Sequence, residues 1–183
     1  MKGSTPPIPQ NGDAADPQKP VILRSHRPGD MGWVIESHGS LYWQEYGWDE
    51  RFEALAARIA ADFIDQLEPE RERCWVAERA GERLGCVFLV RDREQPGDAV
   101  PTARLRLLLV TPSARGLGLG QRLVSECTRF ARAAGYRRIV LWTNSVLESA
   151  RRIYEREGYR LTRERPYTAF GKELVSQDWE LLL

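Results

Sequence analysis

Short apolar runs alternate with longer amphipathic stretches along most of the chain, and this alternation predicts strands and helices in turn. The runs at 103–110 and 138–143 are short and rich in Leu, Val and Ile, which is typical of buried strands. Between 49 and 67 the large apolar residues recur at the spacing of one helix face, at Phe52, Leu55, Ile59 and Phe63. Together these patterns predict an α/β protein.

Turn residues interrupt the pattern and set the expected bounds. Pro28, Gly29 and Asp30 separate a first strand from two helices, and Gly135 and Gly158 end two later helices. Strands are expected at 21–25, 74–78, 84–91, 103–110, 138–143, 159–165 and 174–182, and helices at 31–46, 49–67, 118–134 and 147–157. The order β α α β β β α β α β β predicts an α/β (α+β) fold, with a mixed central β-sheet of about seven strands and helices on both faces.

Composition separates a tail from a single domain. Residues 1–20 contain five prolines and almost no large apolar groups, so we expect a flexible N-terminal tail or linker there. In a chain that is 42% hydrophobic, the remaining residues 21–183 are long enough to bury one sizeable core. They are expected to form one domain.

Charge and cysteine content narrow the possible partners. Lys and Arg number 27 against 26 Asp and Glu, and this balance gives no sign of binding to nucleic acid or an anionic membrane. No apolar run approaches the ~20 residues that span a bilayer. Three separated cysteines and two histidines are too few for a convincing metal site, and the odd cysteine count without a secretory leader favours a reducing cytoplasm. We therefore expect a cytoplasmic protein with no metal, nucleic-acid or membrane partner.

The stretch 105–123, LRLLLVTPSARGLGLGQRL, carries the clearest chemical signal. A buried strand and a turn with Pro112 lead into a glycine segment, 115–120, which opens a helix. Glycines let backbone amides approach an anion, and the first N–H groups of a helix are unpaired and lie at the positive end of its dipole. A pyrophosphate can be held there without lysine, so the segment predicts a site for a nucleotide-like cofactor.

Two other glycine-rich phosphate motifs do not fit this segment. The dinucleotide motif GxGxxG would need glycine where Gln121 or Leu123 stands, and the next strand ends at Asn144 without an acidic residue. A P-loop needs Lys followed by Ser or Thr, but Glu173 follows the sole candidate, Lys172.

A second motif follows the glycine segment. Arg115, Gly118 and Gly120 match Q or R-x-x-G-x-G or A, and residues 150–159, ARRIYEREGY, match A-x-x-x-Y-E-x-x-G-F except for a final Tyr. In these motifs the chain resembles the GNAT (N-acetyltransferase) superfamily, whose element order fits 21–183. The body is also similar to the acetyltransferase half of fusion proteins whose other half is a MarR-type winged helix.

The resemblance implies an acyl-CoA-dependent N-acetyltransferase that uses acetyl-CoA (coenzyme A) as co-substrate. Backbone groups of Leu108, Leu109 and Val110 would pair with the pantetheine arm. The pyrophosphate would be held by Arg115 and the amides of Gly116, Leu117, Gly118, Leu119, Gly120 and Gln121. Tyr154 corresponds to the family's general acid, which protonates the departing thiolate, and the alternative for it is a purely structural core aromatic.

The chain departs from the family at two positions. Many members have Asn seven residues before that Tyr, whereas here the nearest is Asn144, which is expected either to contact the cofactor or to cap the following helix. Many members also have Glu on the strand before the glycine segment, where this chain has Arg104 and Arg106. The resemblance places the helical region with Glu45 at the border of the acceptor site, so Glu45 is the candidate general base, with Asp49 behind it, and a plain surface carboxylate is the alternative for each.

The acceptor side is inferred from one cation and several aromatics. Arg106 would bind a carboxylate of the acceptor, with pairing to an internal Glu as the alternative. Trp43, Tyr46 and Tyr167 lie in regions that flank the acceptor pocket in the family and are taken as substrate contacts. The predicted activity is acetyl transfer to a primary amine of a small molecule, amino acid or peptide by direct attack. A catalytically weak acyl-CoA sensor is the alternative, and the family's frequent dimers leave a homodimer open.

Overall fold

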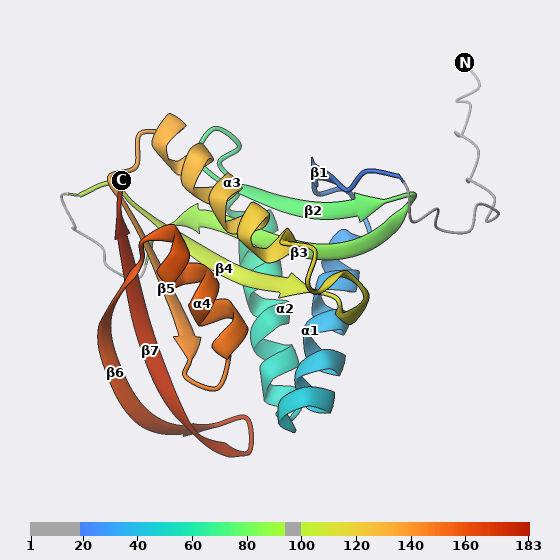
Figure 1. The fold of residues 1–183 in the computed structure, drawn as a ribbon, viewed down its shortest axis with the longest axis vertical. Helices are drawn as coiled ribbons and strands as arrows, with labels where there is room; N and C mark the ends of the chain where they lie inside the picture. The colour runs from blue at the N-terminus through green and yellow to red at the C-terminus, as the bar shows by residue number, and fades with distance from the viewer. Residues whose placement is uncertain (1–18, 94–99) are drawn as a thin grey trace.

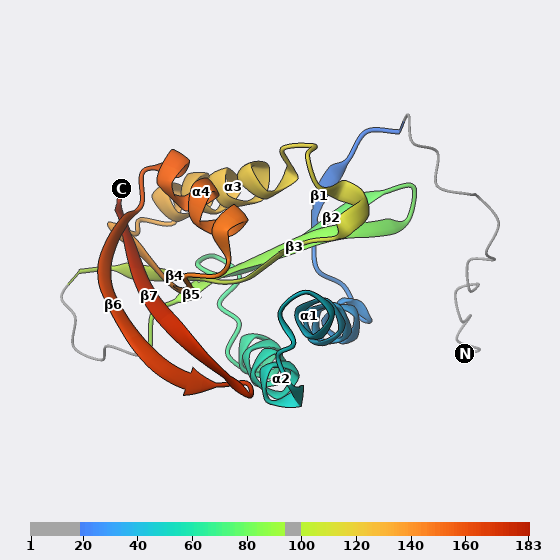
Figure 2. The ribbon, with the colours of Figure 1, turned by 60° about the horizontal axis from the view of Figure 1, so that its bottom comes forward.

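One mixed β-sheet organises the protein. The computed structural model describes residues 19–93 and 100–183, and there the strands follow the order β1-β2-β3-β4-β5-β7-β6 across a seven-stranded sheet (Figure 1). The strands are β1 Ile22–Ser25, β2 Arg73–Arg79, β3 Glu82–Arg91, β4 Thr102–Val110, β5 Arg138–Asn144, β6 Arg160–Ala169 and β7 Lys172–Leu182. The helices are α1 Asp30–Tyr46, α2 Glu50–Asp65, α3 Leu119–Ala133, α4 Glu148–Glu157 and the short 3-10 turn η1 Pro112–Ala114. Helices α1 and α2 cover one face of the sheet, and α3 and α4 cover the other (Figure 2).

The predicted fold class is confirmed. Every helix and strand expected from the sequence is present in the expected order, with ends that differ by a few residues. The largest difference is β6, which continues to Ala169 because it remains paired with β7 as far as Lys172. Residues 1–18 of the predicted N-terminal tail are not among the residues that the structure describes, so the tail stays a prediction.

Helix α2 shows why the periodic pattern was informative. Asp49 begins the helix, and its carboxylate accepts a hydrogen bond from the Arg51 amide at 3.1 Å. Phe52 and Phe63 are buried against the sheet side of the helix, together with Ala56 and Ala60. Burial of this stripe anchors the helix on the sheet and forms one wall of the site described below.

Strands β4 and β5 form a parallel pair that ends early. Their register runs from Thr102 opposite Arg138 to Leu105 opposite Leu141, and no pairing between them follows. Both strands nevertheless continue, β4 to Val110 and β5 to Asn144. The sheet therefore splits between these two strands at their C-terminal ends.

A β-bulge in β4 changes which way its later side chains face. The register with β3 shifts between Cys86 opposite Leu109 and Phe88 opposite Arg106, so β4 has one residue more than β3 in this interval. Leu107 takes up the extra length with a left-handed φ of 49°. Gly85 is needed beside the bulge, opposite Val110, because a Cβ there would lie 2.7 Å from the Leu109 carbonyl oxygen.

A buried carboxylate joins β1, α1 and β3. Asp30 has no exposed surface, and its oxygens accept from Arg24 Nη1 at 2.6 Å, Arg83 Nε at 2.8 Å and the Arg27 amide at 2.8 Å. Burial alone would raise the pKa of Asp30, but the bonds from Arg24 and Arg83 outweigh it and hold that pKa well below its usual range. The first turn of α1 is thereby fixed to the sheet.

We expect Asp30→Asn to destabilise the fold by about 3 kcal/mol or more, because Arg24 and Arg83 lose the buried carboxylate that they both pair with. Because the folded-state pKa of Asp30 is depressed, its contribution is present above the ordinary Asp pKa of about 3.9 and is lost as the pH falls through the folded-state pKa. Urea unfolding of both proteins at pH 7, and at successively lower pH, measures the difference. Asp65→Asn, on an exposed residue at the end of α2, is the control; equal losses in the two variants would contradict the assignment.

Candidate active site

A cavity of about 440 Å³ lies where the C-terminal part of β4 meets the ends of α1, α3 and α4. We call it the outer pocket. It is lined by the predicted strand residues Leu108, Leu109 and Val110 and by every predicted residue from Arg115 to Gln121 except Leu117. Glu45 and Tyr46 of α1 form the opposite wall. The structure therefore brings most of the predicted cofactor residues together around one cavity.

The glycine segment presents free backbone donors to this pocket. Gly118 is the residue before α3, has a left-handed φ of 70°, and offers no side chain to cap the helix. The first turn of α3 also contains no acidic residue. The amides at the start of α3 thus remain available, at the positive end of the helix dipole, for an anion in the outer pocket.

Gly120 is required for a different reason, the close packing of α3 on α4. A Cβ at position 120 would lie 2.6 Å from Ile153 Cδ1, which is closer than non-bonded carbons approach. Ile153 itself lines the outer pocket. A side chain at position 120 would therefore push Ile153 out of place and alter the pocket wall.

An ion pair links two walls of the outer pocket. Arg115 Nη2 lies 2.6 Å from Glu45 Oε1, and both side chains are partly exposed. Glu45 is the only carboxylate among the described residues that line this cavity. The predicted base is thus held by the arginine of the glycine segment.

A second cavity of about 70 Å³, the inner pocket, lies between the diverging ends of β4 and β5 on the side of α1 and α2. It shares Tyr42, Leu108, Leu147 and Ala150 with the outer pocket, so the two cavities are neighbours. Predicted residues Arg106, Asn144 and Tyr154 line the inner pocket. Its remaining wall is mainly aromatic and aliphatic, and includes Trp48, Phe52 and Trp142.

Tyr154 reaches the inner pocket from α4. Its side chain is 4% exposed and packs against Tyr159 and Trp179, with ring centroids 5.7 and 6.4 Å away. Burial raises the pKa of Tyr154 far above its ordinary value, and the nearby phenol of Tyr42 raises it further. The phenol is therefore protonated throughout the neutral pH range.

Asn144 stands at the end of β5 and does not cap the following helix. Its Oδ1 accepts a hydrogen bond from the Tyr167 hydroxyl at 2.8 Å, and Leu147, which begins α4, has no side-chain cap. The capping alternative is thus wrong. Asn144 lines the inner pocket rather than the pocket around the glycine segment, and Tyr167 is brought to the site through this bond.

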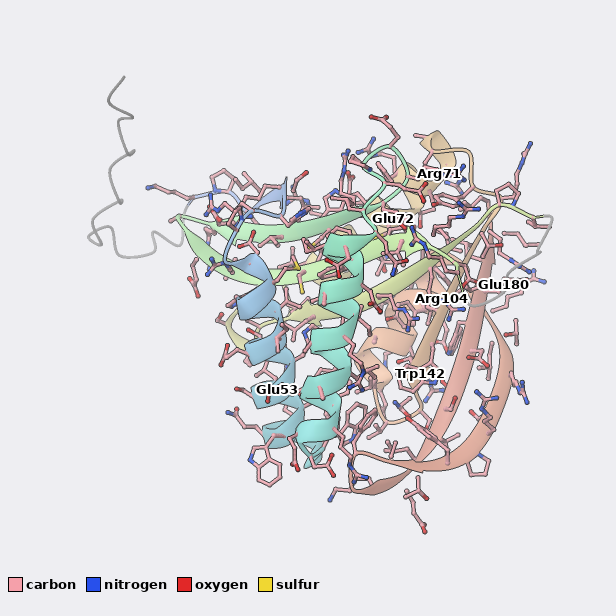
Figure 3. All side chains as sticks on the ribbon, turned by 180° about the vertical axis from the view of Figure 1, so that it is seen from behind. Glu53, Arg71, Glu72, Arg104, Trp142 and Glu180 are labelled. Atoms are coloured by element: carbon pink, nitrogen blue, oxygen red, sulfur yellow. The ribbon has the colours of Figure 1, made fainter. Side chains whose placement is uncertain are left out.

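Other predicted residues lie away from the cavities. Trp43 is 64% exposed and Leu117 is 59% exposed, and neither lines either pocket. Asp49, the second choice for the base, is engaged by Arg51, with Oδ2 2.5 Å from Nη2. Arg104 pairs with Asp92, at 2.9 Å, on the side of the sheet that faces α2, where Trp142 also lies (Figure 3).

Sequence reasoning missed His38. This residue of α1 is 1% exposed and lines the inner pocket together with Tyr42. Within the helix it occupies the buried stripe that also contains Val34, so its position follows the ordinary helical period. A polar residue at a position where the helical period predicts burial was the sequence signal that could have identified His38.

The sheet is split between two parallel strands, and beside the split a glycine segment opens a helix, an arrangement with room and free amides for a nucleotide-like ligand. The sequence matches the Acetyltransferase (GNAT) family over residues 33–159. The chain belongs to this family of acetyltransferases.

Named relatives agree with this membership. The chain is 31% identical over 162 residues to a mycothiol acetyltransferase of Sanguibacter keddieii, and the match covers 87% of this chain but 49% of that protein. It is 30% identical over 121 residues to an uncharacterised N-acetyltransferase of Schizosaccharomyces pombe, covering 66% of this chain and 71% of that one. The chain thus spans about half the length of the Sanguibacter relative.

Solved structures share the fold at low sequence identity. An acetyltransferase of Staphylococcus aureus Mu50 has a TM-score of 0.73 at 20% identity, over 89% of this chain and 98% of that one. The putative acetyltransferase yncA of Salmonella typhimurium, solved with acetyl-CoA, has a TM-score of 0.70 at 20% identity, over 89% and 94%.

The comparisons do not extend to every expected likeness. The matches concern the acetyltransferase region and give no support to the narrower likeness to fusion proteins with a MarR-type half. Among the described residues, no helix is long and apolar enough to cross a membrane, and no group of His, Cys, Asp and Glu side chains could hold a metal ion.

Proposed function

We propose that the protein transfers the acetyl group of acetyl-CoA to a primary amine of a small molecule, amino acid or peptide by direct attack. The observation that carries this proposal is the meeting of two pockets at Leu108. One presents the free amides of the glycine segment, and the other contains the buried phenol of Tyr154. The acetyl donor and the amine acceptor can thus meet beside one proton source, the Tyr154 phenol.

The outer pocket suits acetyl-CoA in its charge and its backbone groups. The amides from Gly116 to Gln121, with Arg115, would hold the pyrophosphate. The edge of β4 that faces β5 is unpaired beyond Leu105, which leaves backbone groups of Leu108 to Val110 for the pantetheine arm. Bound there, acetyl-CoA supplies a thioester carbon for attack.

In the proposed reaction, the amine nitrogen forms a bond to the thioester carbon while the carbon–sulfur bond breaks. The amine loses one proton, and the departing thiolate gains one. Tyr154 donates the proton to the sulfur, because burial keeps its phenol protonated. Glu45 accepts the amine proton through water, since it is the only carboxylate among the described residues lining either pocket.

The inner pocket also supports a choice of acceptor. Its one charged wall residue is Arg106, and no carboxylate of the described residues lines it. A guanidinium attracts carboxylates and repels additional ammonium groups. An amino acid or short peptide therefore fits this wall better than a polyamine or an aminoglycoside. Tyr46 lines the outer pocket, and Tyr167 bonds to Asn144 of the inner one.

Thiol release from acetyl-CoA against amino acids, peptides, polyamines and aminoglycosides tests the proposal. Turnover with an amine, and an N-acetyl product seen by mass spectrometry, would support it. If acetyl-CoA binds but no acceptor is acetylated, the alternative of an acyl-CoA sensor replaces it. If acetyl-CoA does not bind, the cofactor assignment of the outer pocket is wrong.

Tyr154→Phe should lower kcat by about 100-fold or more while leaving the Kd for acetyl-CoA nearly unchanged, because it removes only the proton donor. Since the pKa of Tyr154 is raised, its ionisation should cause no loss of kcat up to about pH 10. Tyr159→Phe is a matched control, because this buried hydroxyl packs near Tyr154 but lines neither pocket. Comparable losses of kcat in both variants would show that Tyr154 acts only through packing.

Gly118→Ala should raise the Kd for acetyl-CoA at least about tenfold, because its Cβ would stand at the wall where the pyrophosphate approaches the α3 amides. Gly135→Ala is its control, since both glycines have a left-handed φ, 70° and 79°, and open space around an added Cβ. Backbone strain should therefore cost each variant a similar stability, about 1 kcal/mol. Calorimetric titration measures the Kd for acetyl-CoA, and thermal unfolding measures the stability. Equal affinity for acetyl-CoA in both variants would show that the pyrophosphate does not bind at this loop.

A further inference from the structure

The inner pocket contains an acceptor atom that nothing in the described structure satisfies. His38 Nδ1 lies 2.8 Å from the Val34 carbonyl oxygen, and because a carbonyl can only accept, this nitrogen carries the proton. Burial lowers the pKa of His38 to about 4, so the ring is neutral at working pH. Nε2 is then a hydrogen-bond acceptor, and it is buried with no partner among residues 19–93 and 100–183.

The same pocket contains a donor with no partner. Asn144 is 1% exposed, and its Oδ1 accepts from the Tyr167 hydroxyl at 2.8 Å. In this orientation of the amide Nδ2 is the atom left over, and it too has no partner in the described part of the chain. A buried polar group without a partner costs about 1–3 kcal/mol, so two of them in one cavity need an explanation.

Both side chains line one cavity of only about 70 Å³, whose other walls are largely apolar. A ligand group that satisfies both must offer one acceptor and one donor within a few heavy atoms. A peptide-type amide has this composition, with a C=O for Asn144 Nδ2 and an N–H for His38 Nε2. A carboxylate or an ester offers acceptors alone and leaves Nε2 unsatisfied.

We propose that His38 and Asn144 select acceptors whose amine is accompanied by an amide, as in amino-acid amides and the N-termini of short peptides. The inference rests on the proposed amine acetylation and adds the acceptor class. His38 Nε2 accepts a hydrogen bond from the amide N–H, and Asn144 Nδ2 donates one to the amide carbonyl oxygen. Tyr167 acts as a positioning residue, because its hydroxyl bonds the side-chain amide of Asn144 and holds it in place.

The decisive comparison uses two substrates of nearly equal size. The N-methylamide and the methyl ester of the same L-amino acid differ only by an N–H in place of an oxygen, and both retain the carbonyl. Assays at about pH 9 keep both α-amines neutral. We expect kcat/KM to be about tenfold or more higher for the N-methylamide, since the ester leaves a buried acceptor unpaired.

Variants of the two residues should have different effects on this selectivity. His38→Phe keeps an aromatic ring but removes the acceptor, so the ratio of the two kcat/KM values should fall towards one, and His38→Gln, which retains an acceptor, should restore part of it. Asn144→Asp removes the donor to the shared carbonyl, so both values should fall together and the ratio should persist. His26→Phe is the matched control, because His26 lies against Phe63 and lines neither pocket.

Each result decides between distinct failures. If no amine of any class releases thiol, the proposed function fails and this inference fails with it. If both substrates are acetylated with a ratio near one, only the inference fails, and water is then what satisfies the two atoms. If a His38 variant does not fold, the wild-type ratio alone still decides, and an unchanged ratio in a folded His38→Phe protein would overturn the role of His38.

Discussion

The early end of the β4–β5 pairing is the constraint on which the rest of the site depends. Beyond Leu105 and Leu141 each strand has an edge that no neighbour covers, although both strands continue towards a helix. Backbone groups on such edges need partners, and the helices that follow these strands, α3 and α4, begin at the same end of the sheet. Free amides, an open strand edge and two pockets therefore coincide there, as ligand sites do at the carboxyl ends of parallel strands.

The bulge in β4 determines which of its side chains face α3 and which face α1 at this opening. Before it, Ala103 and Leu105 pack on the side of α3, and Arg106 faces the inner pocket. The additional residue, Leu107, has a left-handed backbone and packs on the side of α1. Leu108 can then line both pockets, so a local irregularity of one residue joins the two cavities.

The sequence predicted the fold and the position of the glycine segment at the start of α3, because both depend on local patterns. Helical and strand periodicity, with glycines at turns, is sufficient to place the elements, and the segment from Arg115 to Gly120 acts mainly through backbone amides. Two features escaped this reasoning. The contact between Asn144 and Tyr167 spans 23 positions, and the ion pair of Glu45 with Arg115 spans 70, so neither leaves a local pattern.

This difference also explains what family membership contributes. A pocket built from backbone donors depends little on the identity of the side chains around it, so a short glycine motif is a sufficient sequence signal for it. The inner pocket is built from side chains of α1, α2, β4, β5 and α4, and a change at any of these alters what it accepts. Fold and cofactor therefore say little about the acceptor, and the two unsatisfied atoms of His38 and Asn144 are a more specific guide to it than the fold itself.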